Sequence, residues 1–243
     1  ITGDVRLISV GSNGEPANGI SVAPWASADG QTIAFSTQAT NLTSVPVGAQ
    51  PAAKMGPFLQ VVAARSSGLG RSGFYISRNL STGELGNGDS INVRLTPDRR
   101  FGVFESTANN LVAGDTNNAS DIFRFELEGD EVISLIPVST GNLGFGNGSS
   151  RHPSISDDGL SITFETDATN LIESDGNGVT DVLVKSFLTG QVIRMAPTTD
   201  GAEPNGASSE PEISADGNTV TFTSEASNLT PNDTNGVADV YAV

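Results

Sequence analysis

Short runs of alternating apolar and polar residues recur along the chain, and no stretch has the apolar spacing of an amphipathic helix. Residues 161–165 alternate in this way between an Asp158-Gly159 turn and an Asn170-Leu171 pair. Such alternation, bounded by Gly, Asn and Asp, is typical of β-strands joined by tight turns. The pattern therefore predicts an all-β protein.

One string of residues occurs four times: an Asp-Gly turn, a strand that ends in Phe, and an Asn-Leu pair that begins 12 residues after the Asp. In the second copy Arg99 takes the place of the Gly. An Asn-Gly-x-Ser motif also precedes each turn Asp by 11 residues. Because the offsets are constant, the chain is predicted to be built from repeats. The four copies have their turn Asp at Asp29, Asp98, Asp158 and Asp216, and their Asn-Leu pairs begin at Asn41, Asn110, Asn170 and Asn228.

Each copy is predicted to hold four strands, which in the third copy are residues 152–156, 161–165, 181–185 and 191–195. Four antiparallel strands in each unit, repeated radially, are typical of a β-propeller blade. We therefore expect a single β-propeller domain over residues 1–243 with four four-stranded blades. The blades are predicted at about residues 18–80, 87–137, 147–196, and 205–243 together with 1–10.

The two ends of the chain complement one another. Residues 239–243 resemble a third strand, and residues 1–9 resemble a Thr-Gly turn followed by a fourth strand. We therefore expect the N-terminal strand to complete the last blade and close a ring of four, which would remove the exposed sheet edges. The alternative is a four-repeat piece of a larger propeller. Since Ile1 is not preceded by a methionine, we interpret the chain as a mature or excised form.

The first copy differs from the others in its loop at residues 43–57, which is long and carries no acidic residue. Its third and fourth strands are best placed at residues 58–64 and 73–78, although residues 74–80 could instead form the third. The loop is either a docking surface or a tolerated insertion.

The net charge of −16 sets limits on the partners. Such a surface repels phosphate backbones and anionic membranes, which argues against nucleic-acid binding. The chain has no cysteine, and no apolar run approaches the roughly 20 residues of a membrane span. Asn-x-Ser/Thr sequons give weak support to an exported protein. They lie at Asn41, Asn79, Asn118, Asn147, Asn228 and Asn232.

Three copies carry the same acidic loop, Asp-x-Asn-x-x-x-Asp, between the second and third strands. Oxygen atoms at positions 1, 3 and 7, with a backbone carbonyl at position 5, are the ligands that calcium accepts. The pattern resembles the first half of an EF-hand loop, without its helices or its final Glu. We therefore expect three calcium sites. Their ligand positions are Asp115, Asn117, Ala119 and Asp121; Asp175, Asn177, Val179 and Asp181; and Asp233, Asn235, Val237 and Asp239.

The competing interpretation is a plain turn, because Asn and Gly tolerate left-handed backbone and Asp caps it. Turn chemistry does not require a carboxylate at position 7, where an apolar strand begins, in all three copies. We therefore favour calcium with a structural role, pinning loops that a protein without cysteines cannot cross-link.

No catalytic constellation stands out. His152 is the only histidine and precedes a buried strand, with no nucleophile motif near it. Asp157 and Asp158 are a pair of carboxylates such as glycosidases use. Asp158, however, is the repeated turn residue, which explains its presence without catalysis. Trp25 is the only tryptophan and is expected to pack between blades rather than to stack on a sugar. The chain is therefore predicted not to be an enzyme.

The string Pro-x-x-Ser-x-Asp-Gly resembles the blade motif of TolB-type propeller repeats. It occurs at residues 24–30, 153–159 and 211–217, and Asp239-Val240-Tyr241 matches the later Asp-Val-Tyr strand of that motif. The resemblance covers the whole chain and implies the propeller fold. Proteins with such repeats include periplasmic scaffolds, cell-surface proteins and peptidase propeller domains, so no single function is implied.

Together these observations predict a calcium-stabilised propeller that acts as a structural or protein-binding module, with self-assembly or a protein partner. We expect it to be extracellular, on the cell surface or in the periplasm. The alternative is a carbohydrate-binding or polysaccharide-degrading propeller.

Overall fold

The computed structural model describes residues 3, 5–11, 13–42, 57–65, 73–173, 175–196, 198, 202–231 and 233–243. These residues form strands and turns and no helix, so none of them belongs to a helix that could cross a membrane. The strands are β1 Ser21–Ala26, β2 Thr32–Thr37, β3 Gln60–Arg65, β4 Phe74–Tyr75, β5 Ser90–Leu95, β6 Phe101–Ser106, β7 Asp121–Glu128, β8 Glu131–Pro137, β9 Thr140–Gly141, β10 Gly144–Phe145, β11 Ser150–Ile155, β12 Ser161–Thr166, β13 Asp181–Ser186, β14 Val192–Arg194, β15 Ser208–Ile213, β16 Val220–Ser224 and β17 Asp239–Ala242.

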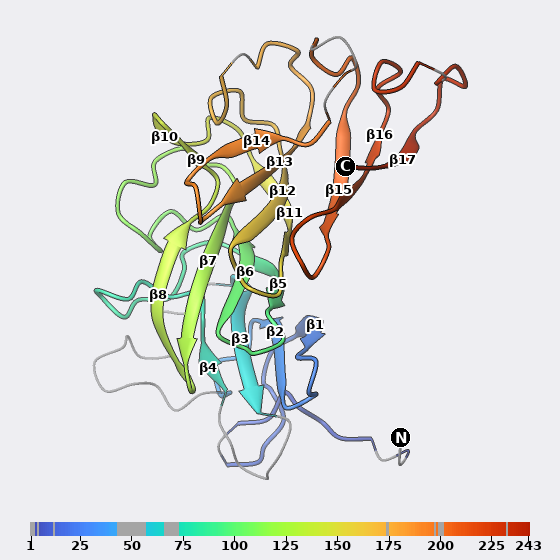
Figure 1. Ribbon diagram of the computed structural model, residues 1–243. Coiled ribbons are helices and arrows are strands. Elements are labelled where there is room, and N and C mark those ends of the chain that lie inside the picture. Colours follow the sequence, from blue (N-terminus) through green and yellow to red (C-terminus); the bar gives the residue numbers. More distant parts are fainter. Residues whose placement is uncertain are drawn as a thin grey trace.

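The strands form four antiparallel blades in chain order, which confirms the predicted all-β propeller of four blades (Figure 1). Blade 1 is β1–β4, blade 2 is β5–β8, blade 3 is β11–β14 and blade 4 is β15–β17. A short hairpin, β9–β10, lies between blades 2 and 3. In blade 1 the third and fourth strands are β3 and β4, as the preferred assignment predicts. The loop at residues 43–57 lies outside the described residues except for its last residue, and so does its predicted docking role.

The repeated Phe residues hold neighbouring blades together. Phe104, fully buried, packs in a core that includes Val61 and Ala63 of blade 1. Phe164 and Phe222 occupy the same place at the next two junctions. Blades 2, 3 and 4 therefore each bury their second strand against the third strand of the blade before them, and this packing repeats at the chain's period.

The two Asn motifs meet in every blade and fasten its incoming chain segment. At blade 3 the Asn147 N–H donates to Asn170 Oδ1 at 2.9 Å, and the Thr169 N–H donates to Asn147 Oδ1 at 2.8 Å. Asn170 Nδ2 also donates to the Phe145 carbonyl at 3.1 Å. The other three blades make the same three bonds, which explains the constant offsets in the sequence. We call this set of bonds the Asn clamp. There is no space for a side chain at Gly148, where a Cβ would lie 2.6 Å from the Asp167 backbone.

The innermost strand of every blade contains a bulge around a non-glycine residue with positive φ. His152 is one of these, with φ 50°. Its N–H donates to Glu105 Oε2 of blade 2 at 3.1 Å, and the Glu210 N–H donates to Glu165 Oε2 of blade 3 at 2.9 Å. A buried carboxylate from one blade thus holds the bulge of the next. The four bulge residues are Ala23, Asn92, His152 and Glu210.

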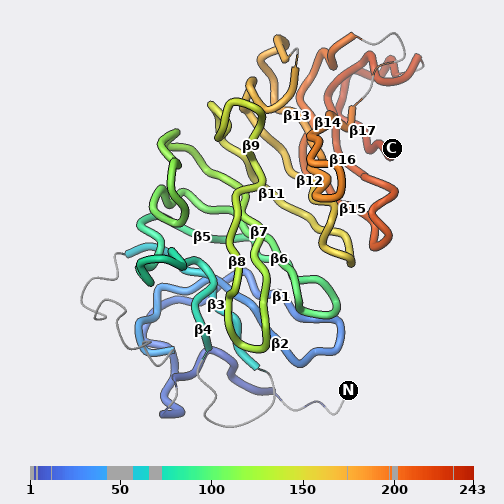
Figure 2. The backbone as a smooth tube through the Cα atoms, turned by 60° about the vertical axis from the view of Figure 1, so that its left-hand side comes forward, coloured from blue at the N-terminus to red at the C-terminus, as the bar shows by residue number. Residues whose placement is uncertain are grey.

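The expected closure of the ring by the N-terminal strand is not found. Blade 4 has three strands, and the described residues between 5 and 9 form no strand with β17. Figures 1 and 2 show the described residues before β1 beside blade 1 and the C-terminus at the other end of an open arc. The segment is held at blade 1 because Ile8 and Ala17 pack against the core of that blade and Asn41 Nδ2 donates to the Pro16 carbonyl at 2.8 Å. Among the described residues, the first and last blades do not meet.

Candidate functional site: the acidic loops

The structure places all twelve predicted ligand residues in the loops before β7, β13 and β17, with the last Asp of each loop starting the strand. In blade 2 the middle Asn turns its amide group inward. Asn117 Nδ2 donates to Asp121 Oδ2 at 2.8 Å and to the Gly146 carbonyl at 2.9 Å, while its Oδ1 accepts the Ala119 N–H. The Asn therefore closes the turn and ties it to the link with the next blade.

The same bonds recur with small changes in the other two loops. Asn177 Nδ2 donates to the Pro204 carbonyl at 3.1 Å, and Asn235 Nδ2 donates to Asp239 Oδ2 at 2.8 Å. In both loops Asn Oδ1 accepts the N–H two residues later. Turn chemistry thus accounts for the Asn in every copy. It does not account for the two acids.

In blade 2 the two acids are buried. Asp121 is 0% exposed and Asp115 is 7% exposed. Ser139 Oγ donates to Asp121 Oδ1 at 2.6 Å, whereas Asp115 Oδ1 is buried with no hydrogen-bond partner. Burial raises the pKa of Asp121 to about 6. The hydrogen bonds from Ser139 and Asn117 lower this pKa, and the nearby Asp115 carboxylate raises it further. Burial also raises the pKa of Asp115. Among the ion pairs of the described residues, none involves either acid.

In blade 3 an arginine from the fourth strand lies between the acids. Arg194 Nη2 lies 3.1 Å from Asp175 Oδ1 and 2.7 Å from Asp181 Oδ2, and Nη1 lies 3.2 Å from Glu203 Oε1. The side chains of Asp175 and Asp181 are 3% and 1% exposed. Burial raises the pKa of each of these two acids, and the guanidinium opposes that rise. The loop motif alone gave no sign of this arginine.

In blade 4 a tyrosine donates a hydrogen bond to the first acid of the loop. The Tyr241 hydroxyl donates to Asp233 Oδ2 at 2.7 Å, and its ring stacks on Phe222 with centroids 5.8 Å apart. Burial and the bond to Asp233 raise the pKa of Tyr241 to about 12.

The Tyr241 pKa can be measured directly. In a Tyr75→Phe variant, Tyr241 is the only tyrosine left, and ultraviolet titration should give a pKa of about 12 rather than the ordinary value of 10. Because the folded pKa is the higher one, the neutral phenol stabilises the fold at pH values below about 10. That contribution should be lost as the pH rises through about 12. Asp233→Asn should bring the pKa back toward 10, and an unchanged value there would contradict the assigned bond.

Blade 1 reaches the same arrangement without an acid. Gln60 starts β3 and pairs with Thr37, as Asp121 pairs with Ser106 in blade 2. Its Nε2 donates to the Gly86 carbonyl at 3.0 Å, and its Oε1 accepts from Ser77 Oγ at 2.9 Å. Sequence reasoning missed this residue because the first loop has a different length. Every blade therefore has a polar group at this position, and only blade 1 has an uncharged one.

The remaining candidates have structural surroundings. His152 Nδ1 lies 3.1 Å from Glu165 Oε1, and the residue is the bulge described above. Asp158 Oδ1 accepts from Ser156 Oγ at 2.6 Å and from the Leu160 N–H, which are turn bonds. Trp25 is partly buried and packs against the core shared by blades 1 and 2, as predicted.

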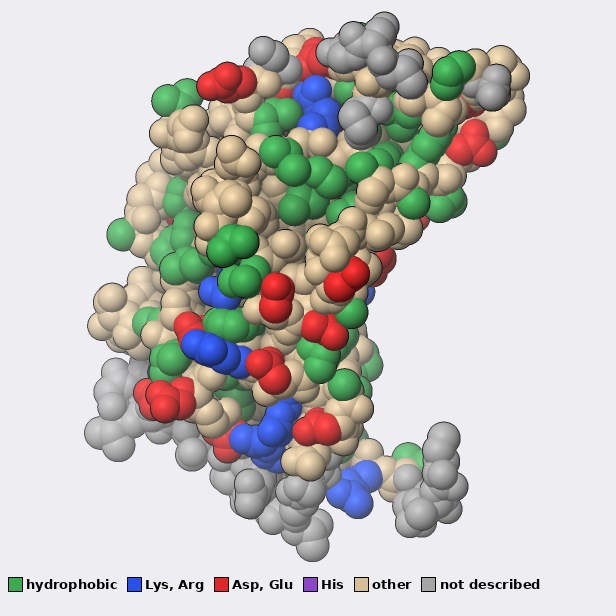
Figure 3. All heavy atoms as spheres, viewed as in Figure 1, with side chains coloured by type: hydrophobic (Ala, Val, Ile, Leu, Met, Phe, Trp, Pro, Cys, Tyr) green, Lys and Arg blue, Asp and Glu red, His purple; other side chains and the backbone are tan. Residues whose placement is uncertain are grey.

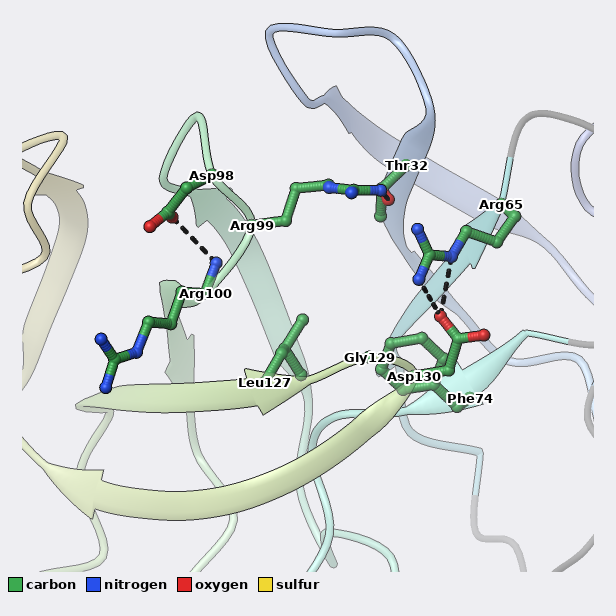
Figure 4. A pocket seen from close by; sticks show the side chains of 9 residues that line it. All are labelled: Thr32, Arg65, Phe74, Asp98, Arg99, Arg100, Leu127, Gly129 and Asp130. Carbon is green, nitrogen blue, oxygen red and sulfur yellow. Dashed lines mark hydrogen bonds and ion pairs between the residues drawn. The ribbon is translucent and has the colours of Figure 1, made fainter.

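At the opposite end of the strands, between blades 1 and 2, is a pocket of about 130 Å³ (Figure 4). Three arginines line it, and each already has a polar partner. Arg65 pairs with Asp130 at 2.6 Å, Arg100 pairs with Glu126 at 2.9 Å, and Arg99 reaches Thr32 Oγ1 at 3.3 Å. Figure 3 shows a similar mixture on that face, with Lys or Arg side chains over blades 1 and 2 beside acidic side chains. The pocket therefore has little unbalanced charge with which to bind an anion.

No known family model matches the sequence, and no curated protein is similar to it in sequence. Solved structures are similar in fold. A putative TolB from Agrobacterium tumefaciens has a TM-score of 0.51 and 15% identity over 93% of this chain and 58% of its own. An oligogalacturonate lyase from Vibrio parahaemolyticus has a TM-score of 0.50 and 12% identity over 93% of this chain and 53% of its own.

TolB from Acinetobacter baumannii has a TM-score of 0.46 and 16% identity over 88% of this chain and 42% of its own. The chain thus spans about half the length of these proteins. At such identities the likeness shows the fold alone. That fold is the β-propeller of TolB-type proteins, as the blade motifs predict.

Proposed function

We propose that this chain is a non-enzymatic, exported propeller module that binds proteins, foremost copies of itself, through its end blades, and that calcium stabilises its acidic loop region. The observation that carries the proposal is the exposed outer face of blade 4. Export is supported by the acidic, cysteine-free composition and by the resemblance to TolB-type repeats.

The outer face of blade 4 has the residues of a blade junction, and no other blade among the described residues covers it. Val182 of β13 is fully buried in the junction between blades 3 and 4. Val240 occupies the same register position in β17, opposite Thr223 as Val182 is opposite Glu165. Val240 is 79% exposed. Within the described residues, β17 pairs only with β16, so its other edge is free to accept a strand.

The segment before β1, around Ile8 and Val10, is placed like the end of a fourth strand, which is what the free edge of β17 could accept. The Val10 N–H donates to the Ile8 carbonyl at 2.8 Å, as the Thr140 N–H donates to the Val138 carbonyl at 2.7 Å after the fourth strand of blade 2. Ile8 packs against the outer core of blade 1. The chain thus approaches blade 1 as if a fourth strand had just ended. Blade 4 of another 243-residue chain has three strands and a free edge among its described residues, so pairing with this segment would give a head-to-tail contact.

Light scattering of the 243-residue protein across a range of concentrations tests this proposal. We expect species larger than a monomer, and we expect Val240→Asp to shift the protein toward monomer because a charge would be buried in the contact. Leu143→Asp is the matched control, since Leu143 is 84% exposed on the β9–β10 hairpin and should leave assembly unchanged. A wild-type protein that is monomeric at every concentration would overturn self-assembly.

A further inference from the structure

We infer that only one of the three acidic loops binds a divalent cation, the loop of blade 2, with Asp115 and Asp121 as its charged ligands and calcium as the ion that suits it. The inference rests on the calcium stabilisation in the proposed function and narrows it from three sites to one. In blade 3 an arginine takes the place of the ion, and in blade 4 the last acid of the loop is partly exposed to water.

In blade 3, Arg194 shows where a cation would lie between the two acids of the loop. A single nitrogen, Nη2, contacts both Asp175 Oδ1 and Asp181 Oδ2. The first and last acids of this loop therefore converge on one point, and that point holds a cationic group. A calcium ion and the guanidinium cannot occupy the same place, so blade 3 has no room for the ion.

Blade 2 has the same loop without the arginine. Arg194 pairs with Leu183 in β13, and the residue at the corresponding register position of blade 2 is Pro137, which pairs with Phe123. Proline brings no charge. The two acids of blade 2 are therefore left as a buried pair, and Asp115 Oδ1 has no hydrogen-bond partner. Two buried carboxylates without a cation are costly, because burial removes the water that solvates them.

The donor set suits calcium. Carboxylate oxygens are hard ligands, and calcium accepts six to eight oxygens with loose geometry, including water molecules. Magnesium requires a tight octahedron, which two carboxylates from opposite ends of a seven-residue loop do not prearrange. The Asn117 amide is already used in the turn, so the two acids carry the charge and water completes the shell.

In blade 4 the need for an ion is smaller. The Tyr241 hydroxyl donates to Asp233, and Asp239 and Asn235 are more exposed than their counterparts in blade 2. Asp233 Oδ1 is buried without a hydrogen-bond partner, as Asp115 Oδ1 is. The two loops differ at the last acid, because Asp239 is partly exposed to water whereas Asp121 is fully buried. An ion therefore gains less in blade 4 than between Asp115 and Asp121.

Calcium titration calorimetry on chelator-treated protein tests the inference. We expect one ion for the wild type, none for Asp115→Asn, and one for Asp175→Asn, which is the same change made in blade 3. Arg194→Met should bind two ions, because it frees the second site. Circular dichroism checks that each variant is folded. If Arg194→Met does not fold, the comparison of Asp115→Asn with Asp175→Asn still shows which loop binds the ion.

The thermal unfolding midpoint gives a second test of calcium binding by the loop of blade 2. Calcium should raise the midpoint of the wild type and of Asp175→Asn, and should leave that of Asp115→Asn unchanged. Three ions in the wild type, none, or an ion retained by Asp115→Asn would each overturn the inference. Assembly is scored separately, by light scattering in the presence of chelator. A wild type that assembles and binds no calcium would refute this site while leaving the proposed self-assembly standing.

Discussion

Replacing Phe104 by Ala is expected to lower the free energy of unfolding by about 3–5 kcal/mol. Phe104 is fully buried and stacks on Phe123 with centroids 5.6 Å apart, and it contacts Phe125 at 6.1 Å. It lies where blade 1 packs on blade 2, so its loss leaves a cavity at a junction of two sheets that cannot close without moving a blade. Guanidinium chloride unfolding measures the change.

Phe187→Ala is the control for this loss. Phe187 is only partly buried, and it lies under the Arg124 guanidinium, which is 4.8 Å from its ring centroid. We expect a smaller loss of stability, because fewer buried contacts disappear. Equal losses for the two variants would contradict the view that the repeated Phe residues carry the blade junctions.

Replacing Arg194 by Met is expected to cost about 3–5 kcal/mol in the presence of chelator, because it leaves buried acids without their cation. The Asp175 and Asp181 side chains are almost fully buried, and the Arg194 side chain is 13% exposed. Methionine preserves much of the volume, so the loss reports the charge rather than a cavity. The measurement is denaturant unfolding without added calcium.

Arg151→Met provides the matched surface control. Arg151 pairs with Asp167 at 2.9 Å, but the two side chains are 39% and 43% exposed. Such exposed pairs contribute about 0–1 kcal/mol, so this variant should unfold close to the wild type. If Arg194→Met were no more costly than Arg151→Met, the guanidinium would not be the charge that holds the loop of blade 3.

The sequence predicted most of the strands because both signals in it are local. Alternation marks residues 161–165 as a strand, and the Asn147 and Asn170 motifs are close enough in the chain to keep one offset. The role of Arg194 could not be predicted in this way. Its position between the acids depends on the register of β13 with β14, and the loop motif carries no information on that register.

Closure of the ring failed as a prediction for a related reason. The described residues 5–9 form no strand, although the Val10 N–H donates to the Ile8 carbonyl as the Thr140 N–H donates to the Val138 carbonyl after β8. Whether the last blade reaches that segment depends on the angle between successive blades. That angle comes from the shapes of all the junction side chains together, and no motif of the sequence encodes it.

The Asn clamp bears on how such a chain changes over evolution. Each blade fastens its incoming segment with its own pair of Asn residues, at the same spacing in all four copies. A duplication or deletion of one whole period therefore leaves every remaining unit with a complete set of bonds. A change of half a period would separate the two Asn residues of a unit. Lineages carrying this chain should accordingly vary in number of units, by whole units, and keep the spacing within each unit.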